Sequence, residues 1–262
     1  MAIIGAILGD ISGSQYEFEG CRPSSGINYQ SCALFTDRCV FTDDTVMTLA
    51  VKMAIIKNRD FSDVFREFAD MYQYVGYGSR FHQWLKSGNS QPMNSYGNGS
   101  AMRISYIAER YNSLIEAQNK AIESAVCTHN HPEGIKGAVV TVSCMWMALH
   151  HASKQEITSY AIQQYPSSKY EFGCDRPISD YRYKYHFDAT CQGSVPVAIR
   201  CFLESSNYEN CLRIAYSLHC DLDTVCCIAG GIAESFYGKT GFDNKLLLNK
   251  YLDAYLYALL YK

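Results

Sequence analysis

Residues 42–56 read TDDTVMTLAVKMAII, a short acidic start followed by a run that is apolar on nearly every face of a helix. Two other runs share this character, at Ala138–Leu149 and Val225–Phe236. Helices that are apolar all round lie inside a bundle rather than on its surface. The third run also contains Gly230 and Gly231, which let a neighbouring helix approach closely. These stretches predict an all-α fold, a compact orthogonal multi-helix bundle with three core helices.

Helices with a single apolar face are predicted around this core. Apolar residues recur at spacings of three and four over Phe61–Val75, Leu114–Ala125 and Leu248–Leu259, as in amphipathic helices. Over Tyr181–Phe187, aromatic residues instead alternate with Arg, Lys and His, which indicates a short extended segment. We therefore expect helices throughout, with one irregular region near residues 165–192.

Length and charge exclude several classes of protein. The chain has 262 residues, with 23 Lys+Arg against 26 Asp+Glu, and a net charge of −3. So small a charge gives no electrostatic reason to expect a dedicated nucleic-acid surface. The longest apolar run, Ala138–Leu149, is well short of the ~20 residues that span a bilayer. We expect residues 1–262 to form a single domain, a monomer with no membrane partner.

The twelve cysteines are read as packing residues. Their density is below the ~8–10% of a disulfide scaffold. No C-x-x-C motif occurs, and Cys226 and Cys227 are adjacent. Met1–Gly9 is apolar but has no basic leader, so it is a poor secretory signal. We expect a cytoplasmic location, where cysteines act as small apolar core residues.

Two similar acidic motifs precede two of the predicted core helices: Thr42–Thr45 (TDDT) and Asp221–Thr224 (DLDT). Taken singly, each is typical of helix capping, in which side-chain oxygens accept hydrogen bonds from the first N–H groups. Taken together, they would gather four carboxylates, whose repulsion would raise their pKa values. A divalent cation would relieve that repulsion, and Asp and Thr oxygens suit Mg²⁺, Mn²⁺ or Ca²⁺ rather than zinc.

A fifth acid is predicted from the N-terminal segment. Gly9 and Gly13 are four residues apart, a spacing that lets a helix pack closely, and Glu17 lies two turns after Asp10 on the same face. Alone, Glu17 is typical of a solvated surface acid. With the four motif carboxylates it would make a charge that two divalent ions nearly balance, and such dinuclear centres catalyse hydrolysis.

Three loops are candidate ligand contacts. In Tyr96–Arg103 (YGNGSAMR), two glycines let the backbone approach a ligand and the next helix offers N–H groups to a phosphate, although a plain Asn-Gly turn is the simpler interpretation. Thr128–Gly134 lacks a zinc-binding pattern and suits a polar helix-entry loop, with His129 available to a substrate hydroxyl or phosphate. Cys191–Pro196 is typical of a turn and helix start, in which Gly193 would line a pocket.

Taken together, these segments resemble the ADP-ribosylglycohydrolase family, whose motifs occur here in the family's order from residue 5 to about residue 238. The TDDT and DLDT pair is the strongest signal. The resemblance implies a compact all-helical domain with two Mg²⁺ ions, or Mn²⁺, in one central dinuclear cleft. The metal ligands that it implies are Thr42, Asp43, Asp44, Asp221, Asp223 and Thr224.

The resemblance also implies roles around the substrate. Glu17 would lie beside the metals, and Glu17, Asp44 or Asp223 would accept the proton of the attacking water. The loop Gly97–Ser100 would hold a diphosphate, and Tyr96 or the segment Tyr181–Phe187 would stack on adenine. The residues expected at the substrate are Tyr96, Gly97, Asn98, Gly99, Ser100, Met102, His129, Gly193 and His219.

One departure from the family concerns His219 and Cys220, where Gly-Gly is usual. Their side chains would narrow the cleft or retune the substrate, and the Cys220 thiol would be oxidisable. We predict hydrolysis of the glycosidic bond at the distal ribose of ADP-ribosylated protein or a small ADP-ribosyl conjugate, with ADP-ribose as product. The alternatives are an inactive relative that binds ADP-ribose or has a structural role and, more weakly, a metal phosphohydrolase.

Overall fold

The computed structural model describes residues 1–16, 28–88 and 91–262. Within these residues all regular structure is helical, apart from one isolated bridge between Gly97 and Thr190, and the predicted all-α class is confirmed. The helices in chain order are α1 (Ile3–Ser14), α2 (Asp43–Lys57), α3 (Phe61–Met71), α4 (Ser79–Ser87), α5 (Gly99–Met102), α6 (Ser105–Arg110), α7 (Leu114–Val126), α8 (Pro132–Leu149), α9 (Lys154–Gln164), the 3₁₀ turn η2 (Ile178–Asp180), α10 (Cys191–Glu204), α11 (Tyr208–Tyr216), α12 (Leu222–Tyr237), α13 (Asn244–Tyr251) and α14 (Ala254–Leu260).

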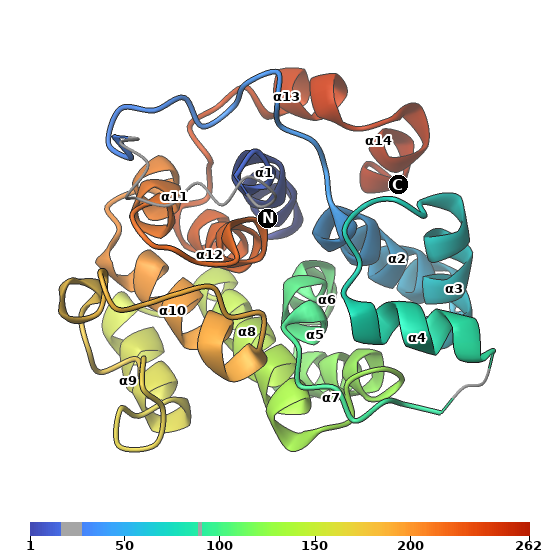
Figure 1. The fold of residues 1–262 in the computed structure, drawn as a ribbon, viewed down its shortest axis with the longest axis horizontal. Coiled ribbons are helices and arrows are strands. Elements are labelled where there is room, and N and C mark those ends of the chain that lie inside the picture. Colours follow the sequence, from blue (N-terminus) through green and yellow to red (C-terminus); the bar gives the residue numbers. More distant parts are fainter. Residues whose placement is uncertain (17–27, 89–90) are drawn as a thin grey trace.

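The first helix packs directly against α12 at the middle of the molecule (Figure 1). Glycines on α1 make this contact possible. A β-carbon on Gly9 would lie 2.1 Å from the carbonyl oxygen of Cys226, and one on Gly13 would lie 2.5 Å from the Cα of Asp223. The two backbones therefore touch, as the spacing of Gly9 and Gly13 predicts, and the facing residues of α1 and α12 are brought together.

The three runs predicted as core helices correspond to α2, α8 and α12. The last is buried at every position from Leu222 to Ser235, and α2 is buried from Asp44 to Ala54. In Figure 1, helices α2 to α4 lie to the right of the central pair, and α8 to α10 lie below it. Both α2 and α12 begin with an acidic motif, so their packing decides where the acids meet.

The cysteines pack as expected among the described residues. All eleven of them are free thiols, and only Cys32 and Cys127 are partly exposed. No described helix is both long and apolar enough to cross a membrane.

Two helix predictions at the ends of segments were wrong. The predicted helix Leu248–Leu259 is broken into α13 and α14, because Leu252 is extended and the Asp253 side chain accepts from the N–H of Leu256 at 2.8 Å, which caps a new helix. Likewise α3 ends at Met71, before the predicted Val75. The carbonyl of Val75 instead accepts from the N–H of Asp43 at 2.8 Å, which ties the loop after α3 to the start of α2.

The extended segment predicted over Tyr181–Phe187 was also wrong. Residues 181–184 form a turn after η2, in which the N–H groups of Lys184 and Tyr185 both donate to the carbonyl of Tyr181. Tyr181 and Tyr185 are buried, whereas Tyr183 is 91% exposed. The aromatic alternation therefore reflects residues on the inside and outside of a turn, not the two faces of a strand.

Candidate metal and substrate site

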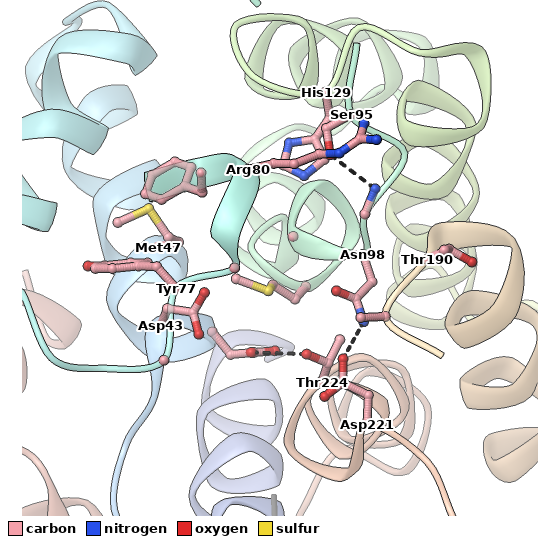
Figure 2. Close-up of a pocket in the computed structure, with 18 of the residues that line it drawn as sticks. Asp43, Met47, Tyr77, Arg80, Ser95, Asn98, His129, Thr190, Asp221 and Thr224 are labelled. Atoms are coloured by element: carbon pink, nitrogen blue, oxygen red, sulfur yellow. Dashed lines mark hydrogen bonds between the residues drawn. The ribbon is translucent and has the colours of Figure 1, made fainter. Parts of the chain in front are cut away.

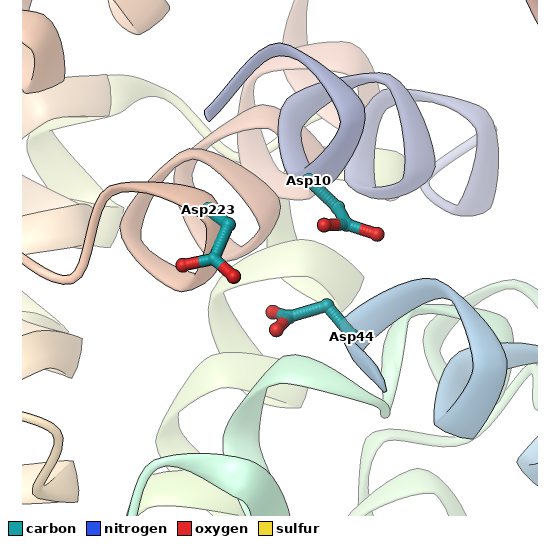
Figure 3. Close-up of side chains that lie close together, drawn as sticks. All are labelled: Asp10, Asp44 and Asp223. Atoms are coloured by element: carbon teal, nitrogen blue, oxygen red, sulfur yellow. The ribbon is translucent and has the colours of Figure 1, made fainter. Parts of the chain in front are cut away.

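Three buried carboxylates meet where α1, α2 and α12 come together. Asp10, Asp44 and Asp223 each contribute an oxygen, and the three oxygens lie within 4.8 Å of one another (Figure 3). Each residue is at most 2% exposed. Like charges this close and this poorly hydrated repel strongly, so the cluster favours either bound protons or a bound cation.

Asp10 is the best satisfied of the three acids. Its carboxylate accepts from the N–H and the hydroxyl of Thr42, at 3.1 and 2.7 Å, and from the N–H and the hydroxyl of Thr45, the former at 3.1 Å. Burial, with the charge of Asp223, nevertheless raises the pKa of Asp10 to about 7. Asp10 therefore holds the TDDT turn in place.

Asp44 has an oxygen that the protein leaves unsatisfied. Its Oδ2 accepts from the hydroxyl of Thr224 at 3.1 Å, but its Oδ1 is buried and has no hydrogen-bond partner among the described residues. Burial, and then the charges of Asp223 and Asp10, raise the pKa of Asp44 well above its usual range. A buried carboxylate oxygen without a donor, surrounded by other carboxyl and hydroxyl oxygens, fits a hard divalent cation.

The remaining motif acids lie beside this cluster. Asp221 accepts from the side-chain amide of Asn98 at 2.8 Å, and burial raises the pKa of Asp221 to about 6 despite that bond. Asp43 is half-buried at the first position of α2. Burial, and then the charges of Asp223 and Asp10, raise the pKa of Asp43 well above its usual range. The carboxyl groups of five residues therefore lie close together where α1, α2 and α12 meet: Asp10, Asp43, Asp44, Asp221 and Asp223.

A cavity of about 390 Å³ opens from these acids. In Figure 2, Asp43, Asp221 and Thr224 lie along one end, whereas Ser95, Arg80 and His129 lie at the opposite end. The predicted site residues that line the cavity are Asp43, Asp44, Tyr96, Gly97, Asn98, Gly99, Met102, His129, Asp221, Asp223 and Thr224.

Three predicted residues lie next to the cavity without lining it. Thr42 is the N-cap of α2 and donates its hydroxyl to Asp10. Ser100 donates its hydroxyl to the carbonyl of Gly134 at 2.7 Å. A β-carbon on Gly193 would lie 2.0 Å from the carboxylate of Asp188, so the space beside this glycine is filled by a side chain of the protein itself. Glu17 lies outside the described residues.

His219 and Cys220 do not line the cavity either. The Cys220 side chain is buried, and its Sγ lies 3.7 Å from the carbonyl oxygen of Ala215. Burial also raises the pKa of the Cys220 thiol well above its usual range, which disfavours the reactive thiolate. Their positions therefore do not support the expectation that these two residues narrow the cleft. Nor do they support the expectation that Cys220 makes the cleft oxidisable.

The glycine-rich loop and His129 form one wall. The side-chain amide of Asn98 bridges Ser194, at 3.0 Å, and Asp221, so this residue ties the loop to the acidic end. A β-carbon on Gly99 would lie no closer than 3.4 Å to His129, and one on Gly97 would meet nothing nearer than 3.4 Å. Packing therefore does not demand glycine at these two positions, and their absent side chains leave room for a ligand.

Sequence reasoning missed several residues of the site. Asp10 was noted only as a neighbour of Glu17, because a single acid in an apolar helix forms no motif. Tyr77 lines the cavity from the loop before α4, Arg80 from the first turn of α4, and Thr190 from the N-cap of α10. No pattern in the sequence marks these three residues. Phe187, which ends the segment Tyr181–Phe187 predicted to contact adenine, also lines the cavity.

An all-helical fold with buried carboxylates at one end of a cavity has the architecture of a hydrolytic enzyme, and comparison with known proteins identifies which kind. The family model described as ADP-ribosylglycohydrolase matches residues 1–258, and the chain belongs to this family of ADP-ribosyl hydrolases.

Relatives span most of the chain. ADP-ribosylhydrolase ARH3 of Mus musculus is 26% identical, over 90% of this chain and 82% of the relative. A putative ADP-ribosyl glycohydrolase, L543, of Acanthamoeba polyphaga mimivirus is 25% identical over 91% and 86%. ADP-ribosylarginine hydrolase Tri1 of Pseudomonas putida is 26% identical over 60% of this chain and 50% of its own length.

A solved structure shares the fold. The chain called "ADP-ribosylglycohydrolase-related protein complex" superposes with a TM-score of 0.73, covering 98% of this chain and 95% of its own, at 19% sequence identity. The predicted bundle architecture is therefore confirmed.

Proposed function

We propose that this chain hydrolyses the glycosidic bond at the distal ribose of an ADP-ribosylated protein or a small ADP-ribosyl conjugate, with divalent cations, and releases ADP-ribose. Membership of the ADP-ribosylglycohydrolase family supports the class of reaction. The observation that carries the metal dependence is the buried Oδ1 of Asp44, which has no donor among the described residues and belongs to a cluster of three carboxylates. Burying three ionised carboxylates together costs folding free energy unless a cation compensates their charge.

Two Mg²⁺ ions, or Mn²⁺, are proposed at the acidic end, with ligands from Asp43, Asp44, Asp221, Asp223 and Thr224. Thr42 is assigned a positioning role, because its hydroxyl donates to Asp10 and accepts from the N–H of Asp44 at 3.3 Å. Cations bound there would supply Lewis acidity toward water and the ribose hydroxyls.

The chain's own residues orient the substrate and move the proton. Asp44 or Asp223 accepts one proton of the water as its oxygen bonds to the anomeric carbon. The bond from that carbon to the leaving group breaks, the leaving group takes up a proton, and the transition state has oxocarbenium character. Glu17 stays a further predicted proton acceptor. Along the wall, Asn98 holds Asp221, and Phe187, which is 51% exposed and lines the cavity, is the candidate for stacking on adenine.

The first test is ADP-ribose release with Mg²⁺ from a panel of arginine-, serine-, base- and small-molecule-linked conjugates. We expect release of ADP-ribose from at least one linkage. The activity should be lost in EDTA and recovered with Mg²⁺ or Mn²⁺. Asp223→Ala should lower kcat by about a hundredfold or more, since lost charge stabilisation is worth several kcal/mol. Asp70→Ala, which removes an exposed carboxylate outside the cavity, is the control. Full activity both in EDTA and in Asp223→Ala would refute the proposal.

The alternative of an inactive relative was motivated by His219 and Cys220. Neither residue lines the cavity, so no observation favours that alternative. We further propose that residues 1–262 act as one monomeric cytoplasmic domain. A single cluster of buried apolar residues, running from Ala2 to Leu260, supports the single domain, and light scattering on the purified chain tests the monomer.

A further inference from the structure

The cavity has a basic end opposite its acids. Arg80 is the second residue of α4, is exposed, and lines the cavity (Figure 2). Its guanidinium carbon lies 5.2 Å from the ring centroid of Tyr96, whose other contact is the edge of His131 at 5.1 Å. In the part of the chain that the structure describes, no carboxylate forms an ion pair with Arg80. Arg80 is therefore a cation at the cavity that no carboxylate of residues 1–16, 28–88 or 91–262 neutralises.

His129 is an uncharged ring at the same end. Its Nδ1 lies 2.7 Å from Thr128 Oγ1, which also accepts from Arg103 at 3.0 Å. That hydrogen bond occupies Nδ1, whichever of the two atoms donates, and leaves Nε2 as the ring nitrogen nearest Gly97 and Gly99. Burial, and then the charges of Arg103 and Arg80, hold the pKa of His129 well below its usual range, so the ring is uncharged.

Several donors near the loop are already committed. The N–H of Gly97 donates to Ser95 Oγ at 3.2 Å, and the N–H of Asn98 donates to the carbonyl of Ala189 at 2.9 Å. The buried Arg103 donates from Nε and Nη2 to Ser124 and Thr128. The loop offers only uncharged N–H groups to an anionic ligand, whereas Arg80 lines the same end with a full positive charge that no described carboxylate pairs.

We infer that Arg80 binds the diphosphate of the substrate and, with the acids at the other end, sets the direction in which the substrate lies. This inference rests on the proposed function. A guanidinium presents a planar fork of donors that matches phosphate oxygens, and such charge-assisted bonds are about twice as strong as neutral ones. Arg80 attracts the diphosphate to its own end of the cavity, so the distal ribose is left at the opposite end, beside the acids.

The test compares three probes on the Mg²⁺-loaded protein by calorimetry: ADP-ribose, ADP and adenosine. Arg80→Gln should weaken ADP-ribose and ADP about ten- to hundredfold, the loss expected for a hydrogen-bonded charge, and leave adenosine unchanged. Arg80→Lys should fall between, since it keeps the charge and loses the fork. In turnover, Arg80→Gln should raise KM by more than it lowers kcat.

The matched control is Lys86→Gln, which removes one positive charge from the last turn of the same helix, outside the cavity, and should change nothing. If Arg80→Gln weakens adenosine as much as ADP, or weakens neither, Arg80 does not bind the diphosphate, while hydrolysis of ADP-ribosyl conjugates by the wild type still stands. If the wild type binds none of the three probes, the proposed function fails and the inference fails with it.

Discussion

At the scale of single residues, Asp10 joins two helices through one carboxylate. It lies on α1 and accepts from the backbone and hydroxyl of both Thr42 and Thr45, which begin α2. The turn between these threonines carries Asp43 and Asp44 into the cavity. Asp10 thus decides where the oxygens of Asp44 point, in addition to adding its own charge to the cluster.

Thr45→Val should lower the affinity for Mg²⁺ about tenfold, because loss of a residue that orients a metal ligand typically costs ten- to a hundredfold. The substitution keeps the shape of the side chain and removes only the hydroxyl that donates to Asp10. Thr48→Val is the control, since Thr48 lies one turn later, is equally buried, and donates to the carbonyl of Met102 instead. Mg²⁺ titration by calorimetry measures both variants, and equal affinity in the two would contradict this role for Asp10.

The acids of the two motifs were predictable from sequence, whereas Arg80 was not. An acid directly before an apolar helix lies at that helix's N-terminus, and two such helices in one core bring their acids together. The loop that leads to Arg80 is tied to the acidic end of the cavity, where the carbonyl of Val75 accepts from the N–H of Asp43. That contact between segments depends on tertiary packing, and no local pattern in residues 72–79 predicts it.

At the scale of helices, the contact between α1 and α12 decides whether the acids meet. The two backbones are so close that no side chain fits between them at Gly9. Asp10 and Asp223 follow within one turn of this contact on their respective helices. Any separation of α1 from α12 therefore opens the carboxylate cluster as well.

Gly9→Ala should destabilise the protein by about 3 kcal/mol or more, since its β-carbon would overlap the backbone of Cys226 and helices cannot repack around a fixed main chain. Urea unfolding followed by circular dichroism measures the change. Gly78→Ala is the control, because Gly78 has φ of −60° and a β-carbon there would meet nothing within 4 Å. A loss in Gly9→Ala no larger than in the control would show that the two helices can move apart freely.

Helix positions were predictable where periodicity is long, and helix ends were not. The core helices α2, α8 and α12 follow from stretches of eleven or twelve mostly apolar residues, 46–56, 138–149 and 225–236. The break between α13 and α14 depends on one capping bond from Asp253, and the turn at 181–184 depends on two bonds to the carbonyl of Tyr181. Single hydrogen bonds of this kind leave the apolar spacing unchanged, so the spacing cannot reveal them.

At the scale of the whole molecule, protons and cations compete for the same carboxylates. Folding raises the pKa of Asp10 to about 7 and that of Asp221 to about 6, from 3.8 in the unfolded chain. Between pH 3.8 and the higher value of each group, the folded protein keeps a proton on a carboxyl that the unfolded chain has already lost. The contribution of these two carboxyls to stability without metal is therefore full below about pH 3.8. It falls as the pH rises to about 7 for Asp10 and about 6 for Asp221, by up to about 1.4 kcal/mol per pH unit for each carboxyl.

Thermal unfolding at pH 5.5 and pH 8, in EDTA and in Mg²⁺, tests this competition. In EDTA the carboxylate cluster should lower Tm at pH 8 relative to pH 5.5. This pH-dependent difference in Tm should be smaller in Asp221→Asn. Mg²⁺ should raise Tm more at pH 8, because it binds the ionised carboxylates without displacing protons. A Mg²⁺ shift that is equal at both pH values, or larger at pH 5.5, would contradict the assignment of the acids as ligands.

The direct contact of α1 with α12 also has a consequence for how the protein is made. Asp10 and Asp223 are separated by more than two hundred positions, so a ribosome must translate most of the chain before the carboxylates can meet. Until then α12 is not available to pack against Gly9 and Gly13 of α1. Contacts between residues so far apart in the chain also form slowly. Divalent cations that bind as proposed therefore cannot reach a complete cluster before Asp223 has been synthesised.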